Sequence, residues 1–200
     1  VRFRAEAMQS AVPVGTGGMA AILGLDDATV IKVCAEASAA SGGVVEAVNF
    51  NAPGQVVIAG ASDAVTKACE LLKAAGAKRA LPLPVSAPFH SSLLQPASEK
   101  LKGYLAHIEF KAPTIPVINN VDVEILHDPI AIKDALVRQA AKPVRWQETV
   151  QAMAGQGITH VVECGPGKVL AGLTKRIHDQ VTGVPVFDDA SLNEVLASLK

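Results

Sequence analysis

A histidine in a loop is the residue of this sequence best suited to acid–base chemistry. His90 lies in Pro84-Val85-Ser86-Ala87-Pro88-Phe89-His90-Ser91-Ser92, after two prolines and directly before a predicted helix. Such a side chain is well placed to face a cleft, and neutral imidazole is the natural general base near pH 7. A surface or helix-capping histidine is the alternative that the local sequence leaves open. No metal site is predicted, because no pair has metal-ligand spacing among the other histidines, His107, His127, His160 and His178.

An arginine near the N-terminus could bind a carboxylate. Arg4 lies in Val1-Arg2-Phe3-Arg4-Ala5-Glu6-Ala7-Met8-Gln9, which is typical of the end of a helix. A guanidinium group can hold a carboxylate through two parallel hydrogen bonds, which lysine cannot match. An arginine on an amphipathic helix is more often a solvated surface residue, so the local sequence alone does not favour the binding role.

Two glycine-rich stretches imitate nucleotide-binding motifs in the wrong context. Gly165-Pro166-Gly167-Lys168 lacks the earlier glycine and the Ser/Thr of a phosphate-binding loop. Gly15-x-Gly17-x-x-Ala20 precedes a predicted strand, whereas a dinucleotide fingerprint follows one. We expect neither motif to bind a nucleotide, and no cofactor is predicted.

Cysteine chemistry is a competing possibility, because a Cys–His pair can perform nucleophilic catalysis. Cys164 ends an apolar strand, where buried and inert cysteines are common, and we expect that structural role. Together with Cys34 and Cys69 it makes an odd number at wide spacings, which fits neither a disulfide framework nor a metal site. A reducing cytoplasm is the simplest interpretation.

Residues 17–83 have the hydrophobic pattern of a βαββαβ unit, the split arrangement of ferredoxin-like folds. Asp26-Asp27 and Ser62-Asp63 are predicted to begin its helices, and a turn is predicted at Asn51-Ala52-Pro53-Gly54. The predicted strands and helices are Met19–Leu25, 27–39, Val44–Phe50, Gln55–Ala59, 62–76 and Lys78–Leu83.

The remainder alternates helices with short strands, which indicates a parallel sheet covered by helices. A short buried strand flanked by prolines is predicted at Ile115–Asn119. The other predicted elements are helices at Leu93–His107, Ile130–Ala140, Gln147–Gln156 and Lys168–Asp179, and a strand at Thr159–Cys164.

Composition indicates a globular chain with no nucleic-acid or membrane partner. Half of the 200 residues are apolar, 18% are charged and the net charge is −1. No apolar run approaches the roughly 18 residues of a membrane span, and the charged N-terminus is not a signal peptide. The chain opens at Val1 within a predicted helix, so we expect it to be part of a longer protein.

Several stretches in unbroken order resemble the malonyl-CoA:acyl-carrier-protein transacylase family, and together they cover nearly the whole chain. Short motifs include Pro88-Phe89-His90 and Pro143-Val144-Arg145-Trp146. The other matching stretches are Met8–Pro13 with Gly18–Ala21, Val48–Gly60, Lys73–Leu83, Ala112–Asn120, Glu163–Leu170 and Leu173–Arg176.

The resemblance implies an α/β fold: part of an α/β-hydrolase-like body with a parallel sheet, plus an inserted ferredoxin-like subdomain. Residues 17–83 would form that small subdomain, and residues 1–16 and 84–200 the partial acyltransferase body. The implied reaction, in type II fatty acid synthesis, moves a malonyl group from malonyl-CoA to the phosphopantetheine thiol of acyl carrier protein through a serine acyl-enzyme.

The resemblance also implies roles for individual residues. His90 matches the base that activates serine, and the backbone carbonyl of Gln139 would receive the other N–H of its ring. Arg4 matches the arginine that holds the malonyl carboxylate, and Asn51 falls on a position that lines the gorge. The basic residues that would dock the acidic carrier protein are Lys78, Arg79 and Lys175.

One departure from the family limits what this chain can do. The nucleophile of the family sits in a Gly-His-Ser-x-Gly elbow upstream of the arginine helix, and no G-x-S-x-G occurs in these 200 residues. The glutamine that helps to form the oxyanion hole, near the N-terminus of the family, is absent too. We therefore expect this chain to carry the base and the carboxylate clamp, and we expect no turnover by this chain alone. An acyltransferase domain of a polyketide synthase and a non-catalytic module that binds carrier protein are the alternatives.

Overall fold

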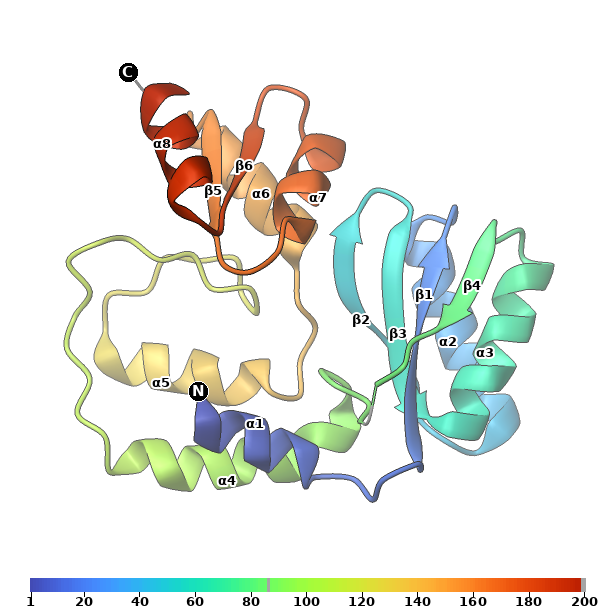
Figure 1. Cartoon of the computed structure of the whole chain (residues 1–200). Coiled ribbons are helices and arrows are strands. Elements are labelled where there is room, and N and C mark those ends of the chain that lie inside the picture. The colour runs from blue at the N-terminus through green and yellow to red at the C-terminus, as the bar shows by residue number, and fades with distance from the viewer. Residues whose placement is uncertain (86, 199–200) are drawn as a thin grey trace. The chain divides into compact units, whose positions relative to one another are not determined.

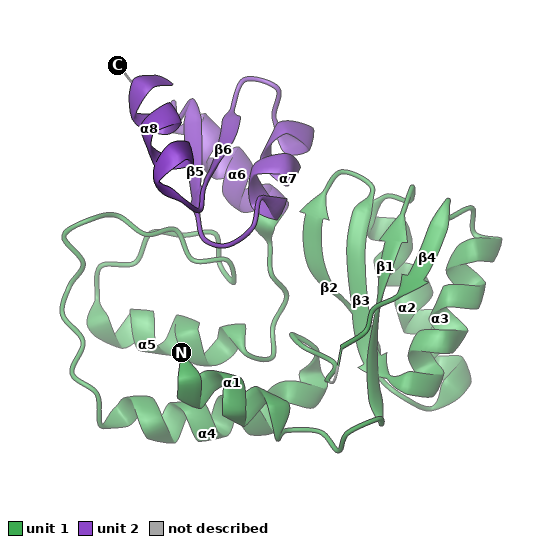
Figure 2. Ribbon diagram, in the orientation of Figure 1, with its two compact units in different colours: residues 1–146 green, residues 147–200 purple. Residues whose placement is uncertain are grey.

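A computed structural model describes residues 1–85 and 87–198 of the chain (Figure 1). The chain forms two compact units, residues 1–146 and residues 147–200 (Figure 2). The sequence predicted a different division, into a small subdomain of residues 17–83 and a body formed by residues 1–16 and 84–200. That division stays a prediction. Residues 17–83 lie entirely within the first unit.

The first unit contains a four-stranded antiparallel sheet with strand order β2-β3-β1-β4. This is the predicted ferredoxin-like arrangement, with two helices between the strands (Figure 1). Its elements are β1 (Gly17–Leu23), α2 (Asp27–Ser41), β2 (Val45–Ala52), β3 (Gln55–Ala61), α3 (Ser62–Ala74) and β4 (Arg79–Pro82).

Local sequence explains the limits of these elements. The Asp26 side chain accepts a hydrogen bond of 2.9 Å from the Thr29 backbone N–H and so caps the start of α2. Gly42 ends that helix in the left-handed conformation, with a φ of 72°. Gly54, with a φ of 70°, makes the tight turn between β2 and β3 that the sequence predicts.

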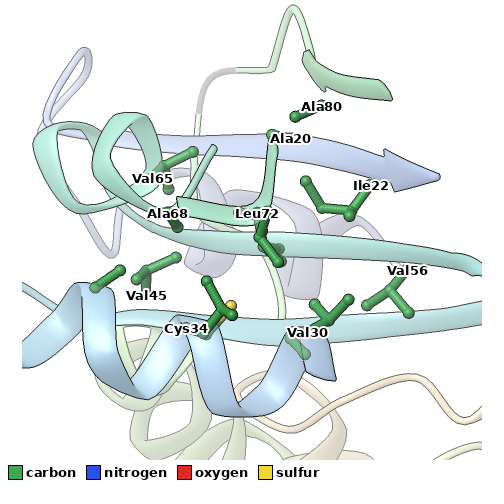
Figure 3. Close-up of a cluster of buried hydrophobic side chains, with 14 of the residues drawn as sticks. Ala20, Ile22, Val30, Cys34, Val45, Val56, Val65, Ala68, Leu72 and Ala80 are labelled. Atoms are coloured by element: carbon green, nitrogen blue, oxygen red, sulfur yellow. The ribbon is translucent and has the colours of Figure 1, made fainter. Parts of the chain in front are cut away.

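The two faces of the sheet are buried in different ways. On one face, α2 and α3 cover a core that includes Ile22, Val56 and Leu72 (Figure 3). A second apolar cluster joins Met19 and Val48 to Phe89, the residue that precedes His90. Alternate residues of a strand point to opposite faces, so the same short strands supply both the core and a support for the His90 loop.

The edge strand β2 pairs with a segment far along the chain. The Phe50 N–H donates to the Val144 carbonyl at 3.0 Å, and the Val144 N–H donates to the Val48 carbonyl at 2.8 Å. These bonds form a parallel bridge between Asn49 and Val144. The stretch Pro143-Val144-Arg145 is thereby fixed to the sheet.

Helices joined by long irregular segments make up the rest of the first unit. Met8, Leu94, Leu101 and Ala140 are buried in their shared core. Phe3 stacks on Tyr104 with ring centroids 4.0 Å apart, which ties α1 to α4. The elements are α1 (Arg2–Gln9), a 3-10 turn (Ser92–Leu94), α4 (Gln95–Ala106) and α5 (Pro129–Gln139).

The buried strand predicted at Ile115–Asn119 is wrong. Within this segment, Ile115 is 74% exposed and Val117 is 61% exposed, and the only ladder contact is an isolated bridge between Ile118 and Ile125. Pro113 and Pro116 lack the N–H groups that a ladder needs, which accounts for the absence of a continuous strand.

The second unit holds a two-stranded parallel sheet of β5 (His160–Cys164) and β6 (Thr182–Val186). The predicted parallel sheet is thus present, although the sequence reading did not identify β6 or α8. The helices are α6 (Trp146–Gly155), which begins at the last residue of the first unit, α7 (Val169–Ile177) and α8 (Asp189–Ser198). No helix in the described part of the chain is long and apolar enough to cross a membrane.

Candidate active site

His90 sits on a strained and tightly held loop. Its φ of 66° is in the left-handed region, which non-glycine residues rarely occupy. Buried neighbours flank it: Pro88 and Ser91 are fully buried, and the Ser91 hydroxyl donates to the Pro88 carbonyl at 2.7 Å. Strain of this kind persists only where the surrounding structure fixes the backbone, and it is common at functional sites.

Two contacts from the sheet hold this loop. The Ser92 N–H donates to Glu46 Oε2 on β2 at 2.6 Å. Gly17 at the start of β1 lies against Pro88 so closely that a Cβ there would be 2.4 Å from Pro88 Cδ. Packing beneath the His90 loop therefore requires a glycine at position 17, which belongs to the Gly15-x-Gly17-x-x-Ala20 stretch that imitates a dinucleotide motif.

The orientation of the His90 ring is set by the end of α5. His90 Nδ1 lies 3.0 Å from the backbone carbonyl oxygen of Gln139. A carbonyl can only accept, so Nδ1 carries the hydrogen and Nε2 keeps a lone pair that can accept a proton. The contact that the resemblance implied is present in the structure.

Burial lowers the pKa of His90 below its ordinary value, and the nearby positive charge of Arg4 lowers it further. The backbone hydrogen bond with Gln139 acts in the opposite direction, because it stabilises the protonated ring. Burial dominates, so the ring is neutral at neutral pH and available as a base.

Arg4 and His90 line the same pocket, which has a volume of about 390 Å³. Arg4 is half-buried on α1, and its Nε is buried with no hydrogen-bond partner among the described residues. Burial also lowers the pKa of Arg4. The other lining residues are Ala5, Met8, Gln9, Met19 and Phe89. A proton acceptor and a cation with an unpaired donor thus lie in one apolar pocket, an arrangement suited to an anionic substrate.

The remaining residues singled out from the sequence lie elsewhere. Asn51 is half-buried on β2 and is not among the residues that line this pocket. Lys78 and Arg79 are exposed at the start of β4 in the first unit, and Lys175 is exposed on α7 in the second.

Cys164 is exposed at the end of β5, so the expectation that it is buried is wrong. In the two-stranded sheet the inward and outward positions alternate, and Cys164 shares the outward side with Val162.

The structure also explains why the Gly165-Pro166-Gly167-Lys168 stretch resembles a phosphate loop without being one. Glu163 Oε2 accepts a hydrogen bond of 2.8 Å from the Ala171 N–H in the first turn of α7. A carboxylate of the protein therefore occupies the position where a helix N-terminus would bind an anion. Among the described residues, no group of three or more His, Cys, Asp or Glu side chains gathers in a way that could hold a metal ion.

Glu46 and Gly17 were not identified from the sequence as parts of the site. Glu46 contacts a residue 46 positions away, and no local pattern signals such a pair. The only sequence signal for Gly17 is its glycine-rich neighbourhood, which fits a flexible junction equally well.

These features define a mixed α/β protein in which His90 and Arg4 line one pocket beside an antiparallel βαββαβ sheet. Residues 1–197 match the model of the acyl transferase domain family, and the chain belongs to that family.

Individual relatives agree with this assignment. The chain is 57% identical over 196 residues to malonyl CoA-acyl carrier protein transacylase of Salmonella typhimurium, covering 98% of this chain and 63% of the relative. The enzyme of the same name from Bacillus subtilis is 42% identical, with 100% and 63% covered. The chain therefore spans less than two thirds of the length of these relatives.

Solved structures show the same fold. A crystal structure of acyl-carrier-protein S-malonyltransferase from Burkholderia pseudomallei is 71% identical with a TM-score of 0.94, covering 98% of this chain and 63% of that one. A type II PKS acyl-carrier protein in complex with its malonyl-transacylase matches with 50% identity and a TM-score of 0.95, covering 98% and 64%.

Proposed function

We propose that this chain supplies the general base and the carboxylate clamp of a malonyl-CoA:acyl-carrier-protein transacylase. The observation that carries the proposal is the pocket in which His90, with Nδ1 bound to the Gln139 carbonyl, lies with the unpartnered Nε of Arg4. Relatives that carry the name of this activity support it.

In the first half-reaction, His90 Nε2 takes the proton of a serine hydroxyl as its oxygen attacks the thioester carbon of malonyl-CoA. The C–S bond breaks, the coenzyme A sulfur takes the proton from the imidazolium, and the malonyl group is left on serine. In the second half-reaction, His90 deprotonates the phosphopantetheine thiol of acyl carrier protein, whose sulfur attacks the acyl-serine. The serine oxygen leaves and is reprotonated by His90.

The serine itself would come from the part of the relatives that this chain does not span. No G-x-S-x-G occurs in the 200 residues, and the resemblance places that elbow upstream of the helix that carries Arg4. His90 Nε2 must then lie within hydrogen-bond reach of the serine hydroxyl in the assembled enzyme.

Arg4 would select malonyl over acetyl donors. A guanidinium binds a carboxylate through paired, charge-assisted hydrogen bonds, and the malonyl carboxylate would satisfy the Nε that has no partner in the described structure. An acetyl group offers no acceptor there and leaves a buried donor unsatisfied. A missing polar partner is penalised more than a missing methyl contact, which is the physical basis of the selection.

The remaining roles follow from the same proposal. Lys78, Arg79 and Lys175 are exposed cations that would attract the acidic carrier protein. Asn51 would line the gorge of the assembled enzyme. The reaction would need no cofactor or metal, and it would serve fatty acid biosynthesis in the cytoplasm.

The test is a fusion of this chain behind the N-terminal segment of the Salmonella typhimurium relative, assayed for transfer from malonyl-CoA to acyl carrier protein. Intact mass should show one malonyl adduct on the fusion and none on the 200-residue chain. An adduct on the chain alone would contradict the serine mechanism and point to Cys164.

The clamp is tested by Arg4→Ala in the same fusion. Malonyl transfer should fall while acetyl transfer holds or rises. Equal losses for both donors would contradict the clamp, and Arg2→Ala on the exposed side of the same helix is the matched control.

A further inference from the structure

The Gln139 carbonyl is available to His90 because it lies at the end of a helix. The last carbonyls of a helix have no intrahelical partner. In α5 the Val137 and Arg138 carbonyls accept from the N–H groups of Ala140 and Ala141, at 3.3 and 3.1 Å, as the chain turns away. The Gln139 carbonyl accepts from His90 instead. The direction of this last turn therefore decides where the acceptor of the ring N–H lies.

The side chain of Arg138 anchors that turn. Its Nη1 and Nη2 donate to the two carboxylate oxygens of Asp122 at 2.6 and 2.7 Å, and its Nε donates to Asp134 at 2.6 Å. The paired geometry fixes the plane of the guanidinium as well as its position. Arg138 is the residue directly before Gln139, so the backbone that carries the acceptor carbonyl is joined to the Asp122 segment.

The Asp122 segment is itself fixed. The Asp122 N–H donates to Asn119 Oδ1 at 2.8 Å, and Arg145 Nη1 donates to the Asp122 carbonyl at 3.2 Å. Val123, the next residue, has a φ of 62°. It and His90 are the two non-glycine residues with positive φ in the described structure, and a β-branched residue in that region is held only by surrounding contacts.

We propose that Arg138 and Asp122 are positioning residues that hold the Gln139 carbonyl at His90 Nδ1 and so keep the imidazole in the tautomer that a base requires. The inference rests on the proposed role of His90 and extends it to an ion pair that does not line the Arg4–His90 pocket. Both side chains are partly exposed, at 37% and 26%, so the pair contributes little to stability, and its effect is on orientation.

The test follows the Nδ1 proton of His90 by NMR in the 200-residue chain with ¹⁵N-labelled histidine. A His90→Gln variant assigns the signal among the five histidines. The wild-type chain should show one tautomer and a slowly exchanging Nδ1 proton. Arg138→Gln should speed that exchange about ten-fold or more and introduce the second tautomer, because the acceptor carbonyl is no longer held.

Further variants separate positioning from general stability. Asp122→Asn, which keeps the shape of the side chain, should act like Arg138→Gln. Glu36→Gln breaks an exposed ion pair with Lys32 on α2 and should leave the signal unchanged. If Arg138→Gln fails to fold, the result for Asp122→Asn decides.

An unchanged Nδ1 proton in a folded Arg138→Gln or Asp122→Asn chain would overturn the proposal. In the fusion enzyme, Arg138→Gln should lower malonyl and acetyl transfer together, by up to about 100-fold, since misplacing a catalytic group affects both donors. The NMR signal needs no acyl substrate. Failure of the proposed transfer reaction and failure of the positioning role therefore give separate results.

Discussion

Arg4 should reduce the stability of the free protein, because it holds a buried donor without a partner. An unsatisfied buried polar group costs about 1–3 kcal/mol. Arg4 is only half-buried, so water screens much of its charge, and the lower end of that range applies, about 1 kcal/mol. Methionine has a similar helix propensity and can keep the apolar contacts of the arginine stem. Arg4→Met should therefore stabilise the chain by about 1 kcal/mol.

The assay is equilibrium unfolding of the 200-residue chain in urea, in which a stability change appears as a shift of the midpoint at constant slope. Arg2→Met in the first turn of the same helix is the control, since Arg2 is exposed and its replacement should have little effect. A clear loss of stability in Arg4→Met, beyond that of the control, would refute the reasoning. It would mean that Arg4 supports the fold and is not held ready for a ligand.

Three further predictions concern His90, the glycine beneath its loop and the Asp122–Arg138 ion pair. In the fusion enzyme, His90→Gln should slow acylation by about 100-fold or more. The wild-type rate should fall only when the pH drops below the ordinary histidine pKa, about 6.5, because burial lowers the pKa of His90. Unchanged acylation in the variant would exclude His90 as the base. Gly17→Ala should destabilise the chain by about 1–3 kcal/mol through the contact with Pro88. The control Gly103→Ala, in open space on a helix, should stabilise the chain. Equal effects of the two variants in urea unfolding would contradict the packing argument. Asp122→Asn should lower the free energy of unfolding by about 1 kcal/mol or less at neutral pH. The hydrogen bond with Arg138 lowers the pKa of Asp122, so this stability difference is present above the unfolded pKa of 3.8 and should disappear as the pH falls through the folded pKa. A stability loss that persists in acid would have another cause than the ion pair.

Local sequence patterns were sufficient to predict the βαββαβ sheet. The alternation of apolar residues in its strands, the cap at Asp26 and the turn glycine at Gly54 all act over a few residues, so the sequence contains their signals directly. The Ile115–Asn119 strand was predicted from its apolar residues between prolines. A strand also needs a partner, and Pro113 and Pro116 lack the N–H groups with which a ladder would form.

The site was predictable only in part, because several of its contacts join residues that lie far apart in the sequence. His90 stood out through its residue type and loop, while Gln139 and Arg4 entered through resemblance to a family. The contacts that hold the His90 loop come from Glu46 and Gly17, and Arg138, the residue before Gln139, pairs with Asp122. These residues meet across tens of positions, and such pairings are set by tertiary packing, which leaves no mark in a local pattern.

The pairing of Val144 with β2 has a consequence for how copies of the protein behave at high concentration. An edge strand with open N–H and C=O groups is a template on which another chain can add. Here the bonds of Val144 cover the centre of the β2 edge. The opposite edge, β4, is four residues long and carries an exposed Arg79 and a proline at position 82. The Pro143-Val144-Arg145 stretch therefore protects the β2 edge of the sheet against edge-to-edge aggregation.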